Sequence, residues 1–113
     1  MSWTRYVDEN GAPEQTGTEG GAILADDEHG LGARITLEKP GAFAPFAITC
    51  GIYQWMMHTR FCSTMEAAQR DYDAMKDELA IILETIPLRT DPDVDRKSAD
   101  VSDAISAFVD KYP

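Results

Sequence analysis

The segment from Ser63 to Pro87 constrains the fold more than any other part of the sequence. Ser63 and Glu66 have the spacing of a capping box, in which each side chain accepts the backbone N–H of the other residue. Beyond it, apolar side chains recur every three or four residues, as on an amphipathic helix: Met65, Ala68, Tyr72, Met75, Leu79, Ile82, Leu83 and Ile86. Because proline disfavours helical backbone at the preceding residue, we expect a helix of about six turns that stops before Pro87. Its apolar stripe needs a surface to cover.

The residues before this helix predict such a surface, an antiparallel β-sheet. Residues 33–39 alternate between the two sides of a half-buried strand, with Ala33, Ile35 and Leu37 on one side and Arg34, Thr36 and Glu38 on the other. Residues 2–7 and 22–27 predict shorter strands. The polar, glycine-rich residues 12–21 predict a mobile loop. Strands followed by helices indicate an α+β fold in one domain of residues 1–113, with three to four strands and the long helix on one face.

The segment 46–62 allows two interpretations. Its apolar side chains fall first on even positions, from Phe46 to Ile52, and then on odd positions, from Tyr53 to Phe61. A strand cannot change its buried face without a bulge or a turn. We expect one bent strand with a bulge near Gly51, because the segment lacks the Asn-Gly or Asp-Gly pair typical of tight hairpins. A hairpin around residues 51–54 is the alternative.

The two cysteines depend on that choice. In a bent strand Cys50 and Cys62 would lie on the order of 40 Å apart, far beyond the reach of a disulfide. We therefore interpret both as small apolar residues, and a shared site would require the hairpin. Cys62 is the better candidate for a reactive thiol, because a helix N-terminus stabilises a thiolate.

The C-terminal third predicts a linker at residues 88–98 and a short second helix from about Ala99 to Lys111. This helix also needs a surface to cover, and a homodimer contact is one candidate. Asp91, Asp93 and Asp95 have the spacing of a calcium loop. However, such a loop needs a glycine at its sixth position and a glutamate at its twelfth, and this sequence has arginine and serine there. The run 26–29, Asp-Asp-Glu-His, also reads better as solvated residues of a turn, so no metal site or cofactor is predicted.

The net charge of −10 excludes some classes of partner. Nucleic-acid binding needs a basic stripe, which this chain lacks, and anionic membranes are disfavoured for the same reason. Neither a membrane-spanning stretch nor a signal peptide is recognisable, so a cytoplasmic location is expected. Residues 1–29 alone carry a net charge of −6. This concentration suggests either a solubilising surface or an acidic face for a basic partner.

One candidate binding site follows from the bent-strand interpretation. If Trp55 and Met57 face the core, a group of polar side chains on two neighbouring strands faces outward together: Arg34, Glu38, Gln54, His58 and Arg60. The arginines could hold a small anion, with the histidine as donor or base. Ordinary cross-strand pairing of these residues is the alternative.

The sequence carries no signature of nucleophilic or metal-dependent catalysis, such as G-x-S-x-G, H-E-x-x-H or C-x-x-C. We therefore expect a small acidic protein that acts by non-catalytic binding or regulation, with a basic protein as partner. The alternative is a domain that binds a small anion or metabolite around His58, with or without catalysis.

Overall fold

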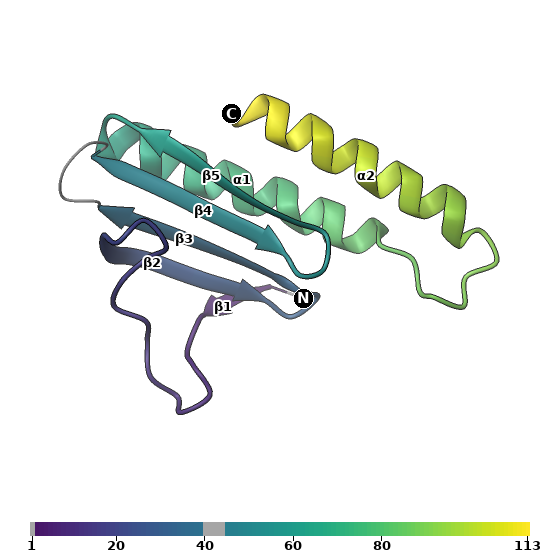
Figure 1. Ribbon diagram of the computed structural model, residues 1–113, viewed down its shortest axis with the longest axis horizontal. Coiled ribbons are helices and arrows are strands. Elements are labelled where there is room, and N and C mark those ends of the chain that lie inside the picture. Colours follow the sequence, from purple (N-terminus) through teal and green to yellow (C-terminus); the bar gives the residue numbers. More distant parts are fainter. Residues whose placement is uncertain (1, 40–44) are drawn as a thin grey trace.

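The computed structural model describes residues 2–39 and 45–113, and it confirms the α+β fold. A single antiparallel sheet precedes two helices (Figure 1). The strands are β1 (Trp3–Arg5), β2 (Ala22–His29), β3 (Ala33–Lys39), β4 (Phe46–Ile52) and β5 (Met56–Cys62), and the helices are α1 (Met65–Thr85) and α2 (Val94–Lys111). Within these described residues the sheet has five strands rather than three to four, because residues 46–62 form two of them.

The strands follow one another across the sheet in the order β1-β2-β3-β4-β5, each antiparallel to its neighbours. Helix α1 covers one face, and α2 lies beside α1 beyond the β5 edge (Figure 1). The opposite face carries neither helix, and we call it the open face. The strand alternation and the pairing register assign these described residues to it: Asp26, Glu28, Arg34, Thr36, Glu38, Ala47, Thr49, Gly51, Met57, Thr59 and Phe61.

The hydrophobic core lies between the sheet and α1, as the stripe on this helix predicts. Its centre is formed by fully buried side chains of β3, β4 and α1: Ile35, Leu37, Ile48, Ile52, Met75 and Leu79. Burial of each such side chain stabilises the fold by about 1.5–3 kcal/mol. Helix α2 adds Val101 and Phe108 to the same cluster, and Tyr112, the residue after this helix, adds a third side chain.

Residues 52–56 form a tight hairpin turn, so the bent-strand prediction is wrong and the alternative is confirmed. Ile52 pairs with Met56, and the N–H of Trp55 donates to the carbonyl oxygen of Ile52 at 2.9 Å. The turn has no glycine and instead places Gln54 at a φ of 71°. Gly51 is not bulged and pairs regularly with Arg34 and Met57.

This turn reverses the predicted faces of β5. Because Ile52 and Met56 are cross-strand partners on the same face, the even-numbered residues of both strands point toward the helices. Met57 and Phe61, predicted to be core residues, lie on the open face and are 72% and 54% exposed. Their apolar character does not reflect burial within this chain.

The helix ends differ from the predicted ones in two places. Thr64 rather than Ser63 caps α1, and its hydroxyl accepts the N–H of Ala67 at 3.1 Å. Helix α2 begins at Val94, within the predicted linker. The carboxylate of Asp91 accepts the N–H of Asp93 and the ammonium of Lys97, which supports an earlier start. Neither helix has the length and apolarity needed to cross a membrane in the part of the chain that is described.

The turn residue Gln54 provides a test of the hairpin. A left-handed conformation strains every L-residue with a side chain, whereas glycine adopts it freely. We expect Gln54→Gly to raise the free energy of unfolding in urea by about 0.5–1 kcal/mol, after the greater chain entropy of glycine is subtracted. Gln54→Ala keeps the strained Cβ and should give no such gain. A loss of stability in Gln54→Gly would contradict the turn geometry.

Candidate functional site

A loop from the N-terminal third lies across the open face and is fastened to it by Glu38. This carboxylate is 1% exposed and accepts the backbone N–H groups of Glu19, at 3.1 Å, and Gly21, at 2.7 Å. The hydroxyls of Thr18 and Thr49 add a hydrogen bond of 3.1 Å between loop and sheet. The predicted mobility of residues 12–21 stays a prediction, but their place on the sheet is defined by these bonds.

Glycine at position 17 allows the loop to approach this closely. A Cβ at Gly17 would lie 2.4 Å from the carboxyl carbon of Glu38, well inside contact distance. The N–H of Gly17 donates to the carbonyl oxygen of Gly21, and the N–H of Gly20 donates to that of Gly17. Residues 17–21 therefore wrap around a carboxylate of the protein itself. Sequence reasoning recognised this segment only as part of a mobile loop.

Between the loop and the sheet lies a cavity of about 470 Å³, within the usual range of ~300–1,000 Å³ for ligand pockets. Its lining combines threonine hydroxyls, apolar groups, two tyrosines and two charged side chains: Tyr6, Glu14, Thr16, Gly17, Thr18, Ile23, Arg34, Thr36, Thr49, Gly51, Tyr53 and Met57. Strands β3 and β4 form its floor, the loop forms one wall, and the β4–β5 turn borders it. We call it the open-face cavity.

Among the described residues that line the open-face cavity, the one basic side chain is already paired. The guanidinium of Arg34 donates from Nε and Nη2 to the two carboxylate oxygens of Asp26, at 2.9 and 2.7 Å. The ring of Tyr6 stacks on the guanidinium, with 3.5 Å between its centroid and Cζ. The hydrogen bonds that Arg34 donates to Asp26 raise the pKa of Arg34 above its ordinary value despite partial burial. This guanidinium has two strong partners before any ligand binds.

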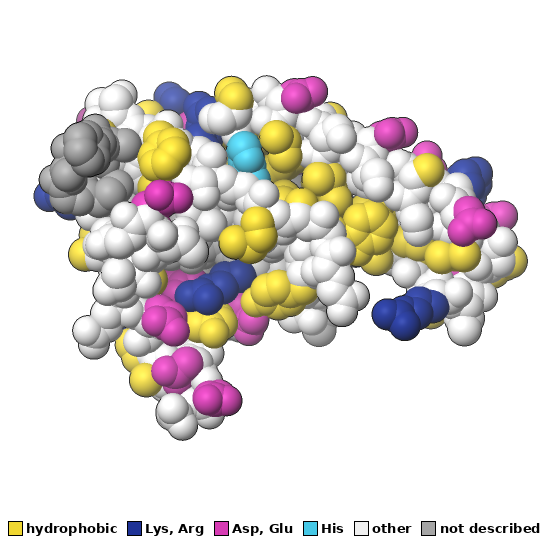
Figure 2. All heavy atoms as spheres, in the orientation of Figure 1, with side chains coloured by type: hydrophobic (Ala, Val, Ile, Leu, Met, Phe, Trp, Pro, Cys, Tyr) yellow, Lys and Arg dark blue, Asp and Glu magenta, His cyan; other side chains and the backbone are white. Residues whose placement is uncertain are grey.

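Carboxylates border the same cavity. The hydroxyl of Tyr53 donates to Oε2 of Glu28 at 2.6 Å. Burial, reinforced by this carboxylate, raises the pKa of Tyr53 to about 12, so the phenol stays neutral at physiological pH. Glu14 adds an exposed carboxylate to the lining. Figure 2, drawn from the open-face side, shows acidic side chains gathered around a basic one over the β2 side of the sheet.

The five residues predicted as one binding site do not come together. Arg34 and Glu38 lie on the open face, and Gln54 lies in the exposed β4–β5 turn. His58 and Arg60 point to the helix side of the sheet, because the hairpin reverses the predicted faces of β5. The structure thus separates the imidazole and one of the two guanidinium groups from the proposed anion site.

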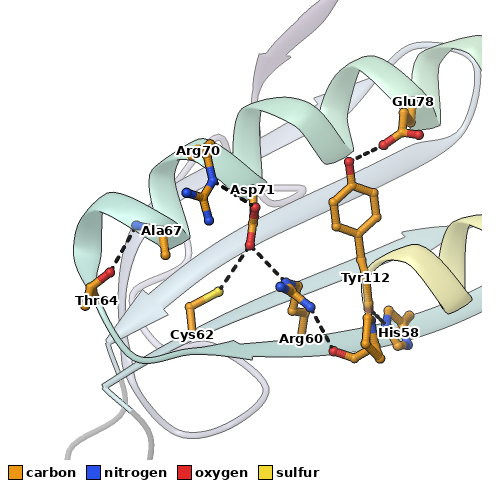
Figure 3. Close-up of polar contacts among 10 residues, drawn as sticks. His58, Arg60, Cys62, Thr64, Ala67, Arg70, Asp71, Glu78 and Tyr112 are labelled. Carbon is orange, nitrogen blue, oxygen red and sulfur yellow. Dashed lines mark hydrogen bonds and ion pairs between the residues drawn. The ribbon is translucent and has the colours of Figure 1, made fainter.

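His58 and Arg60 instead join the end of α2 to the sheet (Figure 3). Nε2 of His58 contacts the carbonyl oxygen of Tyr112. Arg60 donates to Oδ2 of Asp71 at 3.0 Å and to the carbonyl oxygen of Pro113 at 3.2 Å. These partners come from α1 and from the residues after α2, so the cluster connects three elements of the fold.

Glu78 of α1 holds the same end of α2 from the other side. The hydroxyl of Tyr112 and the ammonium of Lys111 both donate to its carboxylate. Partial burial opposes ionisation of Glu78, but these two bonds outweigh it and hold its pKa below the ordinary value. Figure 3 shows the Tyr112 ring between Glu78 and the His58–Arg60 side of the cluster.

The two cysteines are free, buried and separate. Cys62 pairs with Phe46, and Cys50 lies four residues further along β4, which puts the cysteines roughly 13 Å apart. The hairpin thus shortens the expected separation but still excludes a disulfide. Burial raises the pKa of Cys50 to about 12, and burial also raises that of Cys62 despite nearby Arg60. The environment of Cys62 is therefore not that of a reactive thiol.

No group of three or more possible metal ligands converges among the described residues. Residues 26–29 belong to strand β2 and do not form the predicted turn. Because side chains alternate along a strand, their carboxylates point to both faces of the sheet. Asp26 pairs with Arg34 on the open face. Asp27 lies on the other side, where its carboxylate accepts from Tyr72 at 2.6 Å and from Lys76 at 3.0 Å.

Comparison with protein-family models, curated proteins and solved structures finds no significant match for this chain. The candidate site therefore rests on its own geometry. Among the described residues that line the cavity, only Arg34 was predicted as a site residue, and sequence reasoning missed the others, including Tyr6, Tyr53 and Met57. The hairpin alternative was the signal that could have identified Met57, because it keeps the even-numbered residues of both strands on one face.

Glu38 offers the first test of the site. Glu38→Gln replaces one acceptor oxygen by an NH₂ group that faces N–H donors, so a buried donor loses its partner. We expect a loss of about 2 kcal/mol in the free energy of unfolding and faster hydrogen exchange at the Gly21 amide. Glu19→Gln removes an exposed carboxylate and retains the backbone donor, so both quantities should stay unchanged. Equal effects of the two substitutions would contradict the role of Glu38.

The thiols offer a second test. With a pKa of about 12, only on the order of one Cys50 thiol in ten thousand is ionised at pH 8. We expect neither cysteine to react with a disulfide reagent over minutes in the folded protein, and both to react once urea unfolds it. Rapid labelling of Cys62 in the folded state would show that this thiol is accessible and activated.

Proposed function

We propose that this chain is a non-catalytic binding protein that docks a basic protein partner on the open face. One observation carries the proposal: the open face has an exposed apolar strip on its β5 side and carboxylates on its β2 side. A partner surface that is partly apolar and partly basic would complement both the apolar strip and the carboxylates.

The apolar strip consists of Tyr53, Met57 and Phe61, which are 49%, 72% and 54% exposed. Scattered apolar side chains are normal on a protein surface, but neighbouring ones on a sheet face are typical of interaction sites. Met57 and Phe61 lie four residues apart on one face of β5, with Thr59 between them, and Tyr53 lies in the adjoining turn. Aromatic residues and methionine are also enriched at protein–protein interfaces.

The acidic margin consists of Glu14, Glu19, Asp26 and Glu28, at the β2 side of the open face and in the loop above it. Arg34 neutralises only Asp26 among them. The negative charge of the acidic margin attracts a positively charged partner and speeds its association at low ionic strength. It also repels acidic proteins, so it contributes to specificity.

The alternative of a small-anion site has less support. Arg34 is held by Asp26 and Tyr6, while His58 and Arg60 lie on the helix side and bind main-chain oxygens and Asp71. An anion in the open-face cavity would have no unpaired cation among the residues described as lining it, and it would lie near several carboxylates. The geometry favours a cationic partner.

Selection from a library of short random peptides tests the proposal without a known partner. We expect selected peptides to combine arginine or lysine with apolar residues and to bind more weakly as salt rises. Met57→Lys places a charge in the apolar strip and should weaken binding by about tenfold or more.

Ile81→Lys is the matched control, because Ile81 of α1 is 64% exposed and lies on the helix layer. It should leave binding unchanged. The proposal fails if the selected peptides are not basic, if their affinity is independent of salt, or if Ile81→Lys weakens binding as much as Met57→Lys does.

A further inference from the structure

Resting on the proposed function, we infer that the open-face cavity receives one arginine side chain of the basic partner. Its guanidinium binds at the Glu28 carboxylate, beside the ring of Tyr53 and within reach of the charge of Glu14. The cavity thus provides a specific contact within a surface that otherwise offers general charge and apolar complementarity.

The charges around the cavity favour a cation. Glu14, Asp26 and Glu28 place three carboxylates in or beside the lining, against the single guanidinium of Arg34. Arg34 and Asp26 form a closed pair, so the remaining negative charge belongs to Glu14 and Glu28. Neither has a basic partner among the described ion pairs.

Arg34 shows how this face holds a guanidinium. It is bound by two carboxylate oxygens of Asp26 and covered by the Tyr6 ring. Planar guanidinium groups suit this combination of a forked carboxylate and an aromatic ring better than ammonium groups do. Glu28 and Tyr53 again combine a carboxylate with a tyrosine ring. Glu28 lies directly opposite Arg34 on the neighbouring strand, and the described ion pairs do not join the two.

The hydrogen bond between Tyr53 and Glu28 supports the second pair. The Tyr53 hydroxyl donates a hydrogen bond of 2.6 Å to Oε2 of Glu28 and so holds this carboxylate beside the cavity. Because carboxylate oxygens have several lone pairs, Glu28 retains acceptor capacity for an incoming guanidinium. Tyr53 also belongs to the apolar strip, so an arginine bound here would lie where the apolar and acidic halves of the open face meet.

The shape of the cavity fits a side chain better than a flat contact. The cavity has a volume of about 470 Å³, and its loop wall is held in place by the hydrogen bonds to Glu38. Gly51 of β4 forms part of its floor. Added bulk at Gly51 would meet Sδ of Met57 at 2.9 Å, so glycine keeps this part of the floor low. Arginine is among the residues that most often anchor an interface by filling such a pocket.

Three small probes test the inference in the intact chain: ethylguanidinium, ethylammonium and the neutral N-ethylurea. Titrations followed by backbone amide NMR should show ethylguanidinium shifting the amides of Gly17, Gly51 and Tyr53. Glu28→Gln should weaken this binding by about tenfold while keeping an acceptor for the Tyr53 hydroxyl. The control Asp77→Asn makes the same charge change on the exposed side of α1 and should leave it unaltered.

The inference is overturned if N-ethylurea binds as well as ethylguanidinium, if ethylammonium binds more tightly, or if Glu28→Gln and Asp77→Asn act alike. It is also overturned if ethylguanidinium shifts none of the three amides. If selected basic peptides still bind in a manner sensitive to Met57→Lys, only the arginine pocket has failed. If they too do not bind, the proposed function has failed with it.

Discussion

The buried carboxylate of Glu38 determines the form of the open face. Without its bonds to the amides of Glu19 and Gly21, the long N-terminal loop would be held by the hydrogen bond between Thr18 and Thr49 and by main-chain contacts with the start of β2, such as that from the Ile23 N–H to Gln15. With them, a flat sheet surface becomes a walled cavity. A buried carboxylate is costly unless several donors satisfy it, and here the donors come from the backbone of a glycine-rich loop. The cavity and the loop part of the acidic margin, Glu14 and Glu19, depend on this placement.

The sequence predicts the helix layer well and the hairpin poorly, for a physical reason. The apolar stripe of α1 and the alternating apolar residues of β3 are buried in the same core. The helical and strand periods can therefore be recognised directly in the sequence. In β5 the apolar residues Met57 and Phe61 face outward, while His58 and Arg60 face the helices and are satisfied by Asp71 and main-chain oxygens. Hydrophobicity therefore indicates the wrong face where an exposed surface carries apolar residues.

The polar residues on the two faces of the sheet have different roles. On the helix side, Arg60, Asp71, Glu78 and Tyr112 connect α2 to α1 and β5 within the chain. On the open face, internal pairing leaves the carboxylates of the margin beside exposed apolar groups. The loop contacts could not be predicted from the sequence, because residues 17–21 lack periodicity and their partner is 17 residues or more away.

If the chain docks a basic partner as proposed, the open face, rather than either helix, is the binding surface. The most direct measurement is cross-saturation NMR on the protein bound to a selected basic peptide, which maps the amides in contact with it. Binding at the open face predicts that saturation concentrates at Gly51, Tyr53, Met57 and the loop over the sheet. Saturation confined to the outer surfaces of α1 and α2 would contradict it.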